Sequence, residues 1–259
     1  MTIGSGIHVP VMLNEVLDHL NLKKDGTYVD CTFGKGGHSR AILKELKKEE
    51  HLKELGIKEV DGFLLDLGLS SNQLAEEQRG FSYRLSSPLD MRISQEIRLT
   101  AEDIINNYSY ERLADIFYHF GEERKARVIA RKICHRRQKE KITNSEQLVG
   151  IVASCFSHKT NKHPARKVFQ ALRIFINNEL ENLTKSLEIA LKYLAIDGRI
   201  IVISYHSLED RIVKQIFKKR ALSNNFQIIT KKPLIPTPKE LSENHRSRSA
   251  KMRVIVRKV

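Results

Sequence analysis

The sequence predicts an α/β fold in which a parallel β-sheet carries an inserted helical segment. Three short runs of apolar, β-forming residues, 27–33, 60–67 and 199–204, are separated by stretches with helical periodicity. A glycine-rich turn follows the first run directly. Strands that alternate with helices favour a parallel sheet, and the order strand, glycine turn, helix is typical of a unit that binds an anion or a nucleotide.

The three runs differ in what precedes and covers them. Residues 27–33 follow the turn signal Asp25-Gly26, and residues 60–67 are apolar without alternation, as in a strand covered on both faces. An amphipathic helix precedes the third run, and Gly198 is expected to end it. The apolar face of this helix is predicted to consist of Leu183, Leu187, Ala190, Leu191 and Leu194.

Residues 88–164 are predicted to form an inserted helical domain, which leaves residues 1–87 and 165–259 as the sheet-containing core. No strand-like run stands out in the insertion, and its basic run at 124–141 is either a solvated helix face or an RNA contact. Its apolar residues recur at helical spacing, as in Leu113, Ile116, Phe117 and Phe120, and again in Ile129 and Ile133.

Two further runs of β-forming residues lie near the C-terminus, at 226–230 and 252–256. A proline-containing polar loop connects them. We therefore expect an antiparallel pair of strands that closes one edge of the sheet.

The charge balance indicates a polyanionic partner. The 259 residues include 45 Lys and Arg against 31 Asp and Glu, a net charge of +14. Such an excess attracts nucleic acid, because each phosphate contact releases condensed counterions. A generic basic surface is the alternative, so the charge alone does not identify the partner.

The cysteines and the hydropathy predict a soluble, cytoplasmic protein. Cys31, Cys134 and Cys155 show no spacing typical of metal ligands, so neither a disulfide framework nor a metal site is expected. Residues 1–10 do not resemble a secretory signal, and no run of 18 apolar residues predicts a membrane-spanning helix.

The glycine-rich turn departs from the two common nucleotide-binding patterns. Ser39 replaces the last glycine of the dinucleotide pattern, which argues against an NAD-dependent oxidoreductase. Lys35 falls inside the glycines, so a phosphate-binding loop is not formed either. The pattern DxTxGxG from Asp30 instead looks like the first motif of class I methyltransferases. A tight strand-to-helix turn that merely needs small residues is the alternative.

Asp66 ends the second run, and a carboxylate at the end of a parallel strand lies beside the crevice where open sheets bind ligands. It is a candidate acceptor of a hydrogen bond from a substrate amine or a cofactor, or else a cap of the following turn. After the third run, Ser207 and Asp210 predict a helix start. Ser207, His206 and Asp210 are the residue types of a hydrolase triad, but all three lie on one local turn. A hydrolase is therefore disfavoured.

Together, nine blocks resemble the RsmH/MraW family of ribosomal RNA cytosine-N4 methyltransferases, in family order over nearly the whole chain. They are HVPVMLNEVL from His8, YVDCTFGKGGHSRAIL from Tyr28, DGFLLDLGLSSNQL from Asp61, RGFSYR from Arg79, PLDMR from Pro88, GEERKARVIARKI from Gly121, HPARKVFQALRIFINNEL from His163, ISYHSLEDRIVK from Ile203 and RSRSAKMRV from Arg246.

The resemblance implies a Rossmann-like class I methyltransferase sheet that uses S-adenosyl-L-methionine and carries a helical insertion. It implies methyl transfer to the exocyclic N4 amine of a cytosine in the decoding region, with small-subunit ribosomal RNA or the assembled small subunit as partner. The cofactor-binding residues that it implies are Gly36, Gly37, His38, Asp66 and Gln73. We expect Asp66 to act in catalysis as well, as the acceptor for the cytosine amine.

The chain is shorter than the family pattern between its first two runs. Family members carry two further strands there, the first of which ends in an acidic residue that holds the cofactor ribose. Residues 47–59 are too few for them, because a βαβ unit takes roughly 30 residues. We therefore expect the second and third strands to be missing, through an internal deletion, an altered sequence record or a shortened variant. A non-catalytic RNA-binding or ribosome-assembly protein remains the alternative function.

Overall fold

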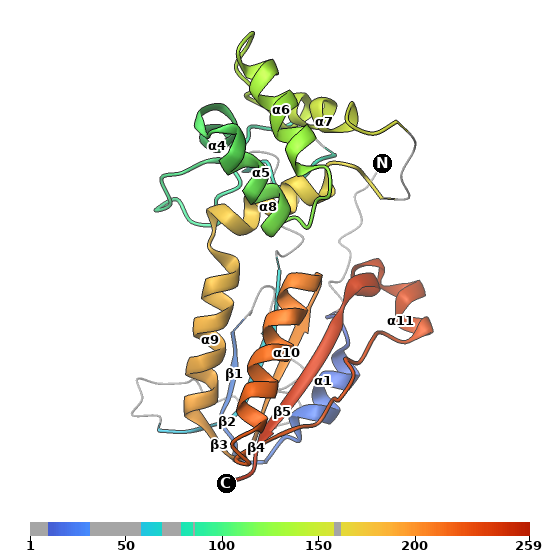
Figure 1. Cartoon of the computed structure of the whole chain (residues 1–259). Helices are drawn as coiled ribbons and strands as arrows, with labels where there is room; N and C mark the ends of the chain where they lie inside the picture. The colour runs from blue at the N-terminus through green and yellow to red at the C-terminus, as the bar shows by residue number, and fades with distance from the viewer. Residues whose placement is uncertain (1–9, 32–57, 69–78, 85, 158–161) are drawn as a thin grey trace. The chain divides into compact units, whose positions relative to one another are not determined.

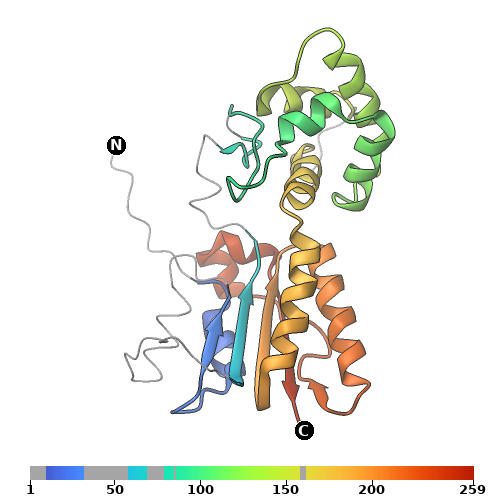
Figure 2. The same cartoon turned by 90° about the vertical axis from the view of Figure 1, so that its left-hand side faces the viewer.

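The structure is a computed structural model that describes residues 10–31, 58–68, 79–84, 86–157 and 162–259 (Figures 1 and 2). The chain forms two compact units. The sheet unit consists of residues 1–68 and 182–259, and the helical unit consists of residues 69–181. The helical unit contains the expected insertion, and the flanking residues 69–87 and 165–181 group with it.

The sheet unit contains a five-stranded mixed sheet in the order β1-β2-β3-β5-β4. Its strands are β1 (Tyr28–Asp30), β2 (Val60–Asp66), β3 (Leu194–Ser204), β4 (Phe226–Ile228) and β5 (Lys251–Arg257). The first three are parallel, and β5 runs antiparallel to both β3 and β4. The structure thus confirms the α/β fold, the three predicted parallel strands and the antiparallel pair at one edge.

Helices cover both faces of this sheet, which explains why β2 is apolar without alternation. Phe63 and Leu65 pack with α9 (Glu179–Tyr193) and α10 (Ser207–Ala221), which lie on the same side of the strands in Figure 2. Leu64 points to the other face, where it packs with α1 (Leu13–Leu20). Fully burying one such side chain contributes about 1.5–3 kcal/mol, so both layers stabilise the strand.

The end of α9 differs from the prediction. The helix ends at Tyr193 and β3 begins at Leu194, so Gly198 lies within the strand. Leu194 pairs with Val60 but Arg199 pairs with Gly62, so the intervening residues of β3 bulge out of register. A Cβ on Gly198 would lie 2.8 Å from the carbonyl oxygen of Ala195, within the same bulge, and 3.0 Å from that of Asp61 on β2. The glycine is therefore needed for the bulge and for the close approach of β2, and not for the helix end.

The helical unit contains α4 (Ala101–Asn107), α5 (Tyr110–His119), α6 (Ala126–Arg137), α7 (Ser145–Ala153) and α8 (Arg166–Ile176). Its core includes Leu113, Ile116, Phe117, Ile129 and Ile133, as the helical spacing predicted. The described part of 88–164 contains no strand. Two short helices of the sheet unit, α11 (Pro238–Glu243) and η2 (His245–Ser249), precede β5. No helix in the described ranges is long and apolar enough to cross a bilayer.

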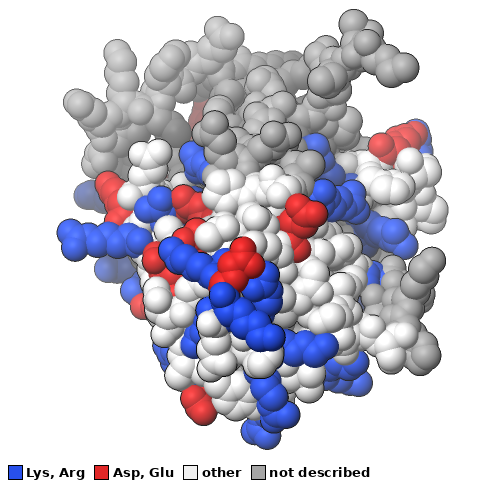
Figure 3. All heavy atoms as spheres, turned by 90° about the horizontal axis from the view of Figure 1, so that it is seen from above, with Lys and Arg blue, Asp and Glu red and all other residues white. Residues whose placement is uncertain are grey.

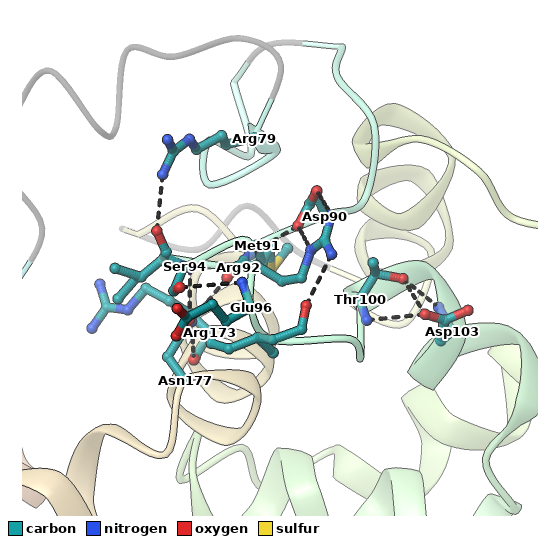
Figure 4. Close-up of polar contacts among 12 residues, drawn as sticks. Arg79, Asp90, Met91, Arg92, Ser94, Glu96, Thr100, Asp103, Arg173 and Asn177 are labelled. Carbon is teal, nitrogen blue, oxygen red and sulfur yellow. Dashed lines mark hydrogen bonds and ion pairs between the residues drawn. The ribbon is translucent and has the colours of Figure 1, made fainter.

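Asn177, directly after α8, ties an irregular segment to the helices (Figure 4). Its buried side chain accepts a hydrogen bond from the Ile93 amide at 2.7 Å and donates to the carbonyl oxygens of Met91 and Arg173, both at 2.8 Å. Blocks that begin at Pro88 and at His163 therefore meet at this side chain.

An ion pair between Asp90 and Arg92 stabilises the same irregular segment. The Arg92 guanidinium donates to both carboxylate oxygens of Asp90, at 2.7 and 2.8 Å, and to the Ile97 carbonyl at 2.9 Å (Figure 4). The hydrogen bond from Arg92 lowers the pKa of Asp90 below its usual value. The PLDMR block thus has a structural role within the helical unit.

We expect Asn177→Ala to lower the free energy of unfolding by about 1–3 kcal/mol, because it removes partners of a buried backbone carbonyl and of a backbone amide. Urea denaturation followed by circular dichroism measures this loss. Gln95→Ala, at an exposed position of the same segment, is the matched control and should change stability by less than about 0.5 kcal/mol. Equal stabilities of the two variants would contradict the assigned role.

Candidate active site

Two polar side chains meet at the carboxyl ends of β2 and β3. Asp66 is the last residue of β2, and Tyr205 is the first residue after β3. The Tyr205 hydroxyl donates a hydrogen bond to Oδ1 of Asp66 at 2.6 Å, and both residues are half-buried. Ligands of open α/β sheets bind outside the carboxyl ends of parallel strands, so this edge is the candidate site.

The register of the two strands brings the pair together. Asp66 pairs with Ile203, and the Leu67 amide donates to the Ile203 carbonyl at 2.9 Å. Gly68 follows with φ +98°, and a Cβ there would lie 3.7 Å from the Tyr205 ring. A positive φ at this position favours glycine.

Tyr205 keeps its proton and therefore acts as a donor. Burial, followed by the negative charge of Asp66, raises the pKa of Tyr205 far above its usual value. A hydroxyl that donates to a carboxylate makes a short, charge-assisted hydrogen bond. This bond fixes the direction in which the Asp66 carboxylate points.

The start of α10 fixes the backbone of Tyr205. The buried Glu209 carboxylate accepts hydrogen bonds from the amides of Tyr205, at 2.8 Å, and His206, at 3.2 Å. The His206 side chain accepts in turn from the Glu209 amide, which completes a capping box.

The predicted helix start, from Ser207 to Asp210, was therefore wrong by one residue. The imidazole ring nitrogen of His206 accepts the hydrogen bond expected of a serine hydroxyl. Asp210 instead binds the Arg253 guanidinium, at 2.6 and 3.2 Å. That ion pair joins α10 to β5.

Of the five cofactor-binding residues predicted from the sequence, Asp66 lies within the described residues. Gly36, Gly37, His38 and Gln73 lie outside them. β1, which precedes the glycine turn in the sequence, ends at Asp30, and the next amide, of Cys31, donates to the Leu64 carbonyl at 2.9 Å. The described part of β1 thus ends at the same edge of the sheet as Asp66.

Tyr205 was missed as a site residue. It lies in the ISYHSLEDRIVK block, and no role was predicted for it. Its position directly after a buried strand, like that of Asp66 at a strand end, was the signal that could have identified it.

This arrangement defines a class of protein: an open α/β sheet that presents a carboxylate to a ligand at the ends of its parallel strands. The sequence model of the MraW methylase family matches residues 5–53 and 48–258. The chain belongs to the MraW methylase family, which consists of S-adenosyl-L-methionine-dependent methyltransferases with a Rossmann-like fold.

One relative is similar over nearly its whole length. The chain is 37% identical over 308 aligned residues to the ribosomal RNA small subunit methyltransferase H of Fusobacterium nucleatum subsp. nucleatum. The alignment covers 98% of this chain and 98% of the relative. The comparisons confirm the family resemblance, and with it the methyltransferase activity and the cofactor.

The described residues fit this cofactor. S-adenosyl-L-methionine offers hydroxyl and ammonium donors, and an oriented carboxylate at a strand end is a suitable acceptor for such groups. Asp66 would hold the cofactor at this edge. When bound, the cofactor supplies an activated methyl group.

Proposed function

We propose that this chain transfers a methyl group from S-adenosyl-L-methionine to the exocyclic N4 amine of a cytosine in the decoding region of small-subunit ribosomal RNA. Its partner is that RNA or the assembled small subunit, which it meets in the cytoplasm. The observation that carries the proposal is the Asp66 carboxylate, held by Tyr205 at the ligand-binding edge of a sheet from this family. The relative's name, ribosomal RNA small subunit methyltransferase H, supports small-subunit ribosomal RNA as the substrate.

Asp66 would act on the nucleophile. The cytosine amine is a weak nucleophile, because its lone pair is delocalised into the ring. A carboxylate that accepts a hydrogen bond from its N–H returns electron density to the nitrogen. As the N–C bond forms and the S–C bond breaks, the nitrogen becomes cationic, and its proton leaves to Asp66 or to water.

The remaining task of the protein is alignment. Positioning two reactants converts a bimolecular step into an effectively unimolecular one, which can contribute several kcal/mol. Tyr205 would serve this purpose by holding Asp66 in one orientation. The target base must leave its stack to reach such a site, which costs least in single-stranded or looped RNA.

We also propose that Gly36, Gly37, His38 and Gln73 contact the cofactor together with Asp66. The family resemblance supports this assignment, since the glycine turn follows β1 in the sequence. Backbone amides at such a turn can approach a ligand closely when no side chain intervenes.

We propose that an internal deletion removed the second and third strands of the family pattern. Three observations support it. β1 is the terminal strand of the described sheet. The family match is split, with its two parts overlapping at residues 48–53. The alignment to the relative, at 308 positions, is longer than the 259 residues of the chain.

The deletion favours one alternative, a non-catalytic RNA-binding or ribosome-assembly protein. Loss of the ribose-binding acid removes a charged hydrogen bond worth about 1.5–3 kcal/mol. Titration calorimetry with S-adenosyl-L-methionine separates the two functions. Low-micromolar affinity supports the methyltransferase, and a folded chain that binds no cofactor supports the alternative.

We expect Asp66→Asn to slow methyl transfer by at least about 100-fold, because the neutral amide is a far weaker acceptor for the cytosine amine. The assay follows labelled methyl groups from S-adenosyl-L-methionine into undermethylated small subunits. Asp18→Asn, at an exposed position on α1, is the matched control and should retain full activity. An active Asp66→Asn variant would remove Asp66 from the mechanism.

We expect Tyr205→Phe to lower the rate constant kcat while KM for RNA stays unchanged, because Tyr205 orients Asp66 rather than RNA. Steady-state methyl transfer at a series of RNA concentrations separates the two constants. Tyr193→Phe, at an exposed position, should leave both constants unchanged. An unchanged kcat of Tyr205→Phe would show that Tyr205 serves packing alone.

A further inference from the structure

Three arginines are exposed at the start of α6, two on one face of the helix and one just before it. Ala126, Ile129 and Ile133 of α6 are buried in the core of the helical unit. Arg124, just before the helix, and Arg127 and Arg131 within it are exposed. Arg127 and Arg131 are four residues apart on the helix and lie on the same side of it, away from the core. Arg124 precedes the N-cap residue Lys125, three positions before Arg127 in the sequence. We call these three arginines the α6 arginine stripe.

No described residue forms a hydrogen bond or an ion pair with the stripe. Other basic groups of the same region do have partners: Arg137 donates to the carbonyl oxygens of Ile105 and Tyr108, and Lys132 donates to the Ser154 carbonyl. These bonds join α6 to its neighbours. The stripe therefore plays no comparable part in holding the helices together.

Neutralising groups are also sparse around the stripe. Residues 124–137 contain no Asp or Glu, and the nearest in the sequence are Glu122 and Glu123, directly before Arg124. Glu123 is buried, and its carboxylate accepts a hydrogen bond from the Lys125 amide. The exposed acidic residues of the packed helices, Glu111 and Asp115 on α5 and Glu146 on α7, form no ion pair with α6. Seen from above, Lys and Arg side chains occur in several separate groups on a described surface that is otherwise largely uncharged, with Asp and Glu beside some of them (Figure 3).

This geometry suits a phosphate backbone. Side chains four residues apart on a helix have Cβ atoms about 5–6 Å apart, so the guanidinium groups of Arg127 and Arg131 can reach successive phosphates. Guanidinium binds phosphate oxygens in a bidentate manner, and each contact releases counterions from the nucleic acid. The like charges of Arg127 and Arg131 on one helix face repel one another, and a bound polyanion removes that cost.

We propose that Arg124, Arg127 and Arg131 bind backbone phosphates of RNA. The identity of this RNA as small-subunit ribosomal RNA rests on the proposed function. Phosphate contacts position a protein on RNA without reading its bases, so the stripe supplies affinity, and sequence choice comes from elsewhere.

The test compares two triple variants of the full chain. One is Arg124→Gln, Arg127→Gln and Arg131→Gln. The matched control is Lys214→Gln, Lys218→Gln and Lys219→Gln, three exposed residues of α10. Both remove three positive charges and keep good helix formers. Circular dichroism verifies that both fold.

Binding to a labelled RNA fragment of the decoding region is measured by fluorescence anisotropy over a series of salt concentrations, without S-adenosyl-L-methionine. The stripe variant should bind at least about tenfold more weakly, and the slope of log K against log salt should become shallower by about two to three, since each phosphate contact contributes about 0.7–0.9. The control should keep the wild-type slope to within about half a unit. The single variant Arg127→Gln removes one phosphate contact, so its slope should become shallower by about 0.7–0.9.

Equal losses in the two triple variants would overturn the proposal in favour of a generic basic surface. Unchanged RNA binding of the stripe variant would also overturn the proposal. If that variant instead lost binding to phosphatidylserine vesicles, the stripe would be a membrane contact and not an RNA contact. Because the assay needs neither cofactor nor turnover, a chain that fails to methylate RNA can still pass it. A failure here likewise leaves the role of Asp66 intact.

Discussion

The parallel pairing of β2 with β3 is the constraint on which the candidate site depends. Asp66 and Tyr205 are 139 residues apart in the chain, and the pairing of Asp66 with Ile203 brings them within one hydrogen bond. A slip of one residue would turn the Asp66 side chain to the other face of the sheet. Such a slip would also exchange the core layers of Phe63 and Leu64, which pack in different clusters.

The sequence predicted those parts of the fold that follow from local pattern. The apolar run at 60–67 and the helical spacing of Leu113, Ile116 and Phe117 each specify one kind of element. Gly198 was misread because a glycine serves equally at a helix end or in a bulged strand, and the carbonyl oxygens of Ala195 and Asp61 that crowd it come together only when β3 bulges against β2.

The candidate site likewise has one part that local sequence pattern predicts and another that depends on contacts between distant residues. Asp66 could be found from the sequence, because a carboxylate that ends an apolar run has few structural explanations. Tyr205 could not be paired with it, because their contact depends on the register of two distant strands. The helix cap at His206 was missed for another reason: serine and aspartate are the usual N-caps, and here an imidazole takes that place.

The contacts of Asn177 and of the Asp90–Arg92 pair bear on how such proteins are recognised. These residues belong to blocks by which the family resemblance was detected, yet their hydrogen bonds hold an irregular segment and the end of a helix in place. Selection for folding alone would preserve them. Search patterns built on these blocks would therefore collect paralogues that have lost methyl transfer as readily as working enzymes. The roles proposed for the strand-end residues Asp66 and Tyr205 make this pair the sharper criterion for telling the two apart.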